Sequence, residues 1–131
     1  MSALATPLQR GLPFAFCGYV LAVVLMHLLL PATWLWPIAY VALLGMLFTY
    51  PAHAAVQGAH RRLEVGVSLA FAAVGLIGLL TAPGLLVAAI AAHGVLDTVK
   101  HFGLGARVPF WYLSGCAVFD LAYAGLLAMQ L

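Results

Sequence analysis

The sequence predicts an all-α integral membrane protein, a bundle of five transmembrane helices. Of its 131 residues, 66% are hydrophobic and only 6% are charged, and the mean hydropathy is +1.16. A soluble domain carries about 25% charged residues, so this chain has too few to cover a soluble surface. Five apolar runs approach the roughly 20 residues that a helix needs to cross the hydrocarbon core. We therefore expect one transmembrane domain over residues 1–131, with no extramembrane domain.

Proline and glycine mark the ends of the predicted helices. Pro31 ends the first run, and the Thr-Ala-Pro-Gly stretch at 81–84 forms a short turn between the third and the fourth. Pro51 falls inside the second run, where it is expected to kink the helix because it lacks a backbone N–H. The five predicted helices cover residues 12–30, 37–60, 63–80, 85–101 and 110–131.

The basic residues predict the orientation of the bundle. With five spans, the N-terminus, the loop after the second helix and the loop after the fourth share one side of the membrane. All five basic residues lie on that side: Arg10, Arg61, Arg62, Lys100 and Arg107. By the positive-inside rule that side is cytoplasmic, with the C-terminus outside. We expect a multi-pass protein of a bacterial inner membrane, in contact with lipid. A net charge of +2 is too small for nucleic-acid binding.

A polar stripe interrupts the fourth apolar run. His93, Asp97 and His101 are spaced i, i+4 and i+8, so they share one helical face. Imidazole and carboxylate groups are common metal ligands and proton carriers, and polar groups inside a membrane are costly and usually functional. Polarity at a helix end would explain His101, and pairing with Lys100 would explain Asp97. Neither explanation accounts for His93, which lies two turns deeper.

A second stripe ends the second helix. His53, Gln57 and His60 are spaced i, i+4 and i+7, and Glu64 extends the row if the helix continues. Because the second and fourth helices run in the same direction, His53 and His93 reach the same depth, roughly 10 Å inside the cytoplasmic end. The sequence therefore predicts a metal site in the cytoplasmic half of the bundle. Its candidate ligands are His53, His60, Glu64, His93, Asp97 and His101.

Asp120 lies roughly 16 Å into the last helix, near the midplane. A carboxylate at that depth needs a proton, a partner or a metal, and candidate partners are Tyr19, Tyr123 or a histidine. We treat Asp120 and Asp97 as the candidate catalytic residues. His27 lies near the opposite end of the first helix, where an interfacial role is the simpler interpretation.

The segment Ala92-His93-Gly94-Val95-Leu96-Asp97 resembles the His-Gly-x-Leu-Asp motif of the bacteriorhodopsin-related membrane β-carotene dioxygenases. Those proteins are iron enzymes with histidine ligands in a helical membrane bundle. The resemblance implies that His93 is an iron ligand and that Asp97 lies near it.

Together these features favour a membrane-embedded metal-dependent enzyme that acts on an apolar or lipid-like small molecule. Non-haem iron would support oxidation, and zinc would support hydrolysis. One alternative is a small proton- or cation-coupled transporter subunit that uses Asp120 and the histidine stripes; five helices would then require a homo-oligomer. Another is an accessory subunit of a membrane complex, either structural or carrying haem between His53 and His93, which share one depth.

Overall fold

The computed structural model describes residues 7–131, and this part of the chain is helical, without a β-strand. Its elements are α1 (Pro7–Leu29), the short 3₁₀ helix η1 (Ala32–Trp34), α2 (Leu35–Leu47), α3 (Thr49–Gln57), α4 (Arg61–Thr81), α5 (Pro83–Lys100) and α6 (Phe110–Ala128). Five spans are long and apolar enough to cross a membrane: α1, the stretch Ala32–Gln57, α4, α5 and α6. The predicted fold class is confirmed, and on length and composition the chain is a multi-pass membrane protein.

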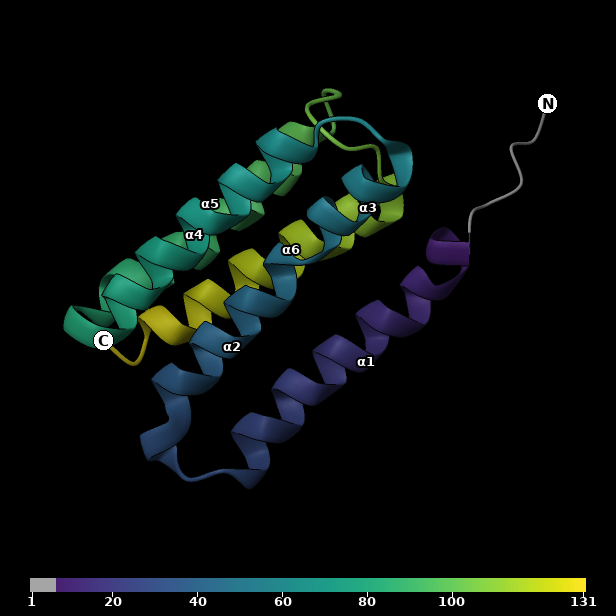
Figure 1. Cartoon of the computed structure of the whole chain (residues 1–131). Coiled ribbons are helices and arrows are strands. Elements are labelled where there is room, and N and C mark those ends of the chain that lie inside the picture. The colour runs from purple at the N-terminus through teal and green to yellow at the C-terminus, as the bar shows by residue number, and fades with distance from the viewer. Residues whose placement is uncertain (1–6) are drawn as a thin grey trace.

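Successive spans run in alternating directions, and α5 lies beside α4 (Figure 1). It packs along α4 on one side and α6 on the other, and it also contacts α2. The largest fully buried apolar side chains of the core are Leu43, Leu86 and Ile90. α1 packs mainly against α2 and stands at the edge of the bundle (Figure 1). Large apolar side chains such as Phe14 and Val118 face outwards, as lipid contact requires.

The second span is interrupted at Phe48, between α2 and α3. Pro51 has no N–H to give to the carbonyl of Leu47, four residues earlier. That carbonyl instead accepts a hydrogen bond of 3.0 Å from the Ser68 hydroxyl of α4. The kink that the sequence predicted is therefore present as a break in the helix, and the freed carbonyl ties the second span to the third.

α3 ends at Gln57, three residues before the predicted end of that helix. Gly58 adopts a φ of 71°, a left-handed conformation that terminates helices and that glycine enters without steric cost. His60, also left-handed with a φ of 61°, then precedes α4. As a result His60 leaves the helical face that carries His53, and the predicted stripe is broken after Gln57.

Candidate metal centre

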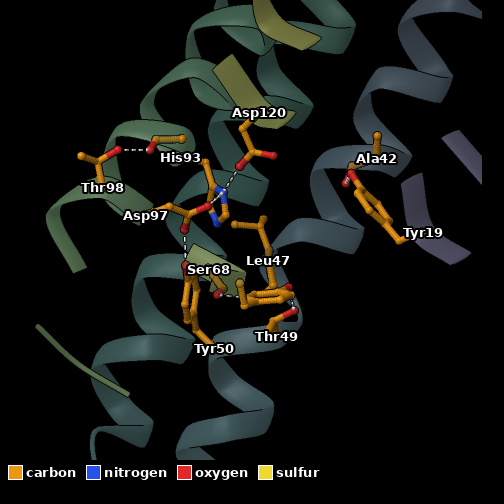
Figure 2. Close-up of polar contacts among 12 residues, drawn as sticks. Tyr19, Ala42, Leu47, Thr49, Tyr50, Ser68, His93, Asp97, Thr98 and Asp120 are labelled. Carbon is orange, nitrogen blue, oxygen red and sulfur yellow. Dashed lines mark hydrogen bonds and ion pairs between the residues drawn. The ribbon is translucent and has the colours of Figure 1, made fainter. Parts of the chain in front are cut away.

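Three buried residues meet between α5 and α6. His93 and Asp97 come from α5 and Asp120 comes from α6, and each offers a ligand atom within 4.8 Å of the other two. Their exposed fractions are 2%, 0% and 1%. Figure 2 shows the His93 imidazole between the two carboxylates. We call these three residues the His/Asp group.

Helical spacing and one glycine bring the group together. His93 and Asp97, at i and i+4, lie one turn apart on the same face of α5. Gly94 faces α6, and a Cβ built there would lie 3.1 Å from the Cβ of Asp120 and 3.3 Å from the carbonyl oxygen of Ala117. Glycine at this position therefore lets the two helices approach closely enough for His93 to reach Asp120.

Each member of the group is held by a hydrogen bond on one side. The Nδ1 of His93 lies 2.7 Å from Oδ2 of Asp120 and donates to it. The hydroxyl of Tyr50, on α3, donates to Oδ1 of Asp97 (Figure 2). These bonds orient the imidazole and one carboxylate, as supporting hydrogen bonds do around metal ligands.

On the other side, His93 Nε2 and Asp97 Oδ2 are buried and have no hydrogen-bond partner in the described part of the chain. An unpaired buried polar atom costs about 1–3 kcal/mol, and the two carboxylates, when both are ionised, place two negative charges beside one imidazole. A divalent cation would supply both a ligand partner and the balancing charge.

The ligand atoms of the group lie close together. Two ligands, each about 2.1 Å from a tetrahedral metal, lie about 3.4 Å apart, and each residue of the group offers one atom within 4.8 Å of the other two. Because Nδ1 of His93 gives its hydrogen to Asp120, Nε2 is the imidazole nitrogen that is free to bind the metal. One imidazole and two carboxylates form a mixed nitrogen and oxygen set that is suitable for iron or zinc. Three protein ligands also leave coordination positions for water or substrate.

Aromatic rings and a small cavity surround the group. Phe71 of α4 packs edge-on against the His93 ring, with centroids 5.6 Å apart, and the Tyr50 ring lies 6.0 Å away. On the α1 side, Asp120 lines a cavity of about 150 Å³ together with Tyr19, Cys116 and residues of α2. Asp120 thus lies between the imidazole and a space that faces the loosely packed helix α1.

Glu64, a candidate ligand from sequence, lies in a separate contact. Its Oε1 accepts hydrogen bonds of 2.6 Å from Lys100 Nζ and 2.7 Å from the backbone N–H of Ala106. Both side chains of the ion pair are buried, and Lys100 Nζ also lies 4.1 Å above the ring of Tyr50. Lys100 therefore pairs with Glu64 rather than with Asp97.

The other candidate histidines also lie outside the His/Asp group. His53 is buried on α3, where its Nδ1 contacts the carbonyl of Thr49 at 3.0 Å and its Nε2 has no partner among residues 7–131. His60 is exposed. The half-buried His101 packs on Phe110 with ring centroids 4.5 Å apart.

Of the partners considered for Asp120, the structure selects a histidine, His93. Tyr19 instead donates to the carbonyl of Ala42, and Tyr123 bonds His27 at 2.7 Å. Tyr50 was not predicted from the sequence as a partner of Asp97. The signal was present, because Tyr50 lies at i−3 from His53 and so shares its helical face.

Comparison with protein-family models, curated proteins and solved structures finds no match to this chain.

Proposed function

We propose that this chain is a membrane-embedded metal-dependent enzyme for apolar or lipid-like substrates, with the metal held by His93, Asp97 and Asp120. One observation carries the proposal: a buried group of three ligand residues in which His93 Nε2 and Asp97 Oδ2 have no hydrogen-bond partner among the described residues. Buried polar atoms are nearly always paired, and unpaired ligand atoms beside two carboxylates suit a bound cation.

This ligand set is smaller than the one that the sequence suggested, and it includes Asp120. Glu64 is satisfied by Lys100 and by the backbone of Ala106. His60 is exposed, and His101 lies beside Phe110 rather than beside Asp97. The predicted stripes thus contribute His93 and Asp97 to the proposed centre, and the last helix contributes the third ligand.

Iron is the first candidate metal and zinc the second. Iron in this set would support oxidation with O₂, whereas zinc would activate a water for hydrolysis. The resemblance to membrane β-carotene dioxygenases supports His93 as a ligand of iron. The buried position of the group, within a bundle whose outer faces are apolar, favours a substrate that arrives from the lipid phase.

Elemental analysis of detergent-purified protein tests the proposal. We expect near-stoichiometric iron or zinc in the wild type, and loss of most of it in His93→Ala and Asp120→Asn. His60→Ala and His101→Ala are matched controls, since both remove an imidazole outside the His/Asp group, and both should retain the metal. Helical content by circular dichroism and elution as a single species confirm that each variant is folded.

Two results would contradict the proposal. One is a folded, monodisperse wild type that contains no metal after growth in medium supplemented with iron and zinc. The other is equal metal loss in the two control variants, which would favour the broader ligand set at the end of the bundle.

A second candidate function is proton-coupled transport. Its support is the unbroken row of titratable groups formed by Tyr50, Asp97, His93 and Asp120, in which neighbours lie within hydrogen-bonding or ion-pairing distance. Such rows carry protons in membrane transporters. Proteoliposomes with an imposed pH gradient would then lose proton flux in Asp120→Asn, and absence of flux in the wild type would remove this candidate.

A further inference from the structure

A second cavity lies between α1 and α6, on the other side of Phe119 from Asp120. Its volume is about 450 Å³. Its lining is almost entirely apolar and includes Val24, Leu28, Ala122 and Leu126. It lies towards the ends of α1 and α6 that are remote from the Lys100–Glu64 ion pair. A space of this size within an apolar wall suits a lipid-soluble small molecule.

Three polar side chains line this cavity. His27 and Tyr123 hydrogen-bond to each other at 2.7 Å, and the third, Gln130, follows the end of α6. If the phenol donates to Nε2, the imidazole retains an N–H on Nδ1. If Nε2 donates, the phenol retains its O–H. In either arrangement the pair keeps one donor for a ligand. The described lining contains no Lys, Arg, Asp or Glu, so the complementary group is a neutral oxygen acceptor rather than a carboxylate or an ammonium.

The two cavities share Phe119 and no other described residue of their linings. Its ring stacks on Tyr123 with centroids 5.7 Å apart and packs edge-on against Tyr19 at 5.6 Å. These aromatic contacts, together with the His27–Tyr123 pair, join α1 to α6 on both sides of the shared residue. We call the interface between α1 and α6 that contains both cavities the α1–α6 seam.

We propose that the α1–α6 seam binds a neutral, oxygen-bearing lipid, such as a long-chain alcohol, ketone or ester. The oxygen accepts the hydrogen bond of the His27–Tyr123 pair, and the hydrocarbon chain passes Phe119 into the cavity beside Asp120. That the chain reacts there rests on the function proposed above, whereas binding in the seam does not depend on it.

The geometry of α6 specifies which part of the lipid meets the His/Asp group. Tyr123 and Asp120 lie three residues apart, about 5 Å along the helix axis. Tyr112, at the far end of the smaller cavity, lies eleven residues from Tyr123, about 16 Å along the axis. The carbon nearest Asp120 is therefore a chain carbon several bonds from the anchored oxygen, not the oxygen-bearing carbon itself.

Two photoreactive fatty alcohols test this orientation in phosphatidylcholine vesicles that contain the full chain. One carries a diazirine next to the hydroxyl group and the other carries it at the end of the chain, and labelled residues are located by mass spectrometry. We expect the first probe to label residues near Tyr123 and the second to label residues near Cys116. Ala122→Trp, which fills the larger cavity, should abolish both patterns. Val118→Trp, on the lipid-facing side of the same helix, should leave them unchanged.

Competition identifies the head group. Unlabelled oleyl alcohol should reduce labelling in the seam at lower concentration than oleate or octadecene does. Tyr123→Phe and His27→Leu together should raise the concentration of oleyl alcohol that is required, about five-fold, as expected for the loss of one hydrogen bond, because either substitution alone leaves one donor in the cavity. Neither substitution should change competition by octadecene. More effective competition by oleate would overturn the neutral head group.

The proposal is refuted if both probes label the outer faces of α1, α4 and α6 alike and Ala122→Trp acts no more strongly than Val118→Trp. The result then reflects ordinary lipid contact. Metal content separates this failure from failure of the proposed function: oriented labelling of a metal-free protein would retain the lipid site and reject the enzyme. A metal-loaded protein without labelling in the seam would reject the lipid site alone.

Discussion

The ion pair between Glu64 and Lys100 offers a test of the fold that is independent of any metal. Lys100 Nζ lies 2.6 Å from Glu64 Oε1, and the exposed fractions of the two side chains are 4% and 2%. Glu64→Gln keeps an acceptor for the backbone N–H of Ala106 but leaves the lysine cation without its partner. Lys100→Met leaves the carboxylate uncompensated. Each single change therefore buries an unpaired charge.

Removing one partner of a buried ion pair costs about 3–5 kcal/mol, whereas replacing both partners by neutral groups of similar size is often nearly neutral. We therefore expect each single variant to lose about 3 kcal/mol or more of unfolding free energy. The double variant Glu64→Gln/Lys100→Met should recover most of that loss, because it contains no unpaired charge and still bonds Ala106.

Unfolding in detergent micelles with increasing dodecyl sulfate measures the effect, with tryptophan fluorescence and circular dichroism as parallel probes. A double-mutant cycle then isolates the interaction of the pair. If the losses of the two single variants simply add in the double variant, or if each is below about 1 kcal/mol as for an exposed pair, the ion pair is not buried as described. Arg62→Gln, which removes a charge at the exposed start of α4, controls for net charge.

Three further predictions concern single contacts. Tyr50→Phe removes the hydrogen bond that orients Asp97, so metal affinity should fall about 10–100-fold with the fold intact; metal titration in competition with a chelator measures it, and unchanged affinity would contradict the proposed role. Gly94→Val should separate α5 from α6 and lower metal content although all three ligands remain, whereas Gly125→Val, where a Cβ meets nothing within 4 Å, should retain it. Ser68→Ala leaves the carbonyl of Leu47 unpaired and should cost about 1 kcal/mol of unfolding free energy; Thr81→Val, which removes a hydroxyl that bonds the carbonyl of Ile77 within its own helix, should cost less.

Apolar runs and proline positions were sufficient to predict the five spans and the interruption near Pro51. The ends of the helices were harder, because an apolar run marks the part of a helix that fits the membrane rather than the whole helix. α1 thus begins at Pro7, before the apolar run that starts at residue 12. The end of α3 depends on the left-handed conformation of Gly58. Glycine is common inside membrane helices, so its presence in the sequence does not predict that conformation.

The candidate site was predicted in part. Helical periodicity placed His93 and Asp97 on one face, and the depth of Asp120 indicated that it needs a partner. The pairing of Asp120 with His93 depends on the rotation of α6 about its own axis and on the close approach at Gly94, and neither can be read from one sequence. Matching depths suggested that His53 would join His93. Depth alone does not specify which helical faces meet.

The buried polar residues of α5 also explain how a largely apolar bundle selects one arrangement of its helices. Contacts between apolar side chains in lipid discriminate poorly between neighbouring helices, because lipid chains are equally apolar. Along α5, His93 bonds α6, Asp97 bonds α3 and Lys100 bonds α4. Each pairing fixes a different neighbour, so these residues would stabilise the fold even without a metal. Loss of activity in a variant of His93 or Asp97 would therefore not distinguish a structural role from metal binding. Metal content in a folded Asp120→Asn variant distinguishes the two roles. The amide that replaces the carboxylate retains an oxygen that accepts a hydrogen bond from His93, but it lacks the negative charge that a cation needs.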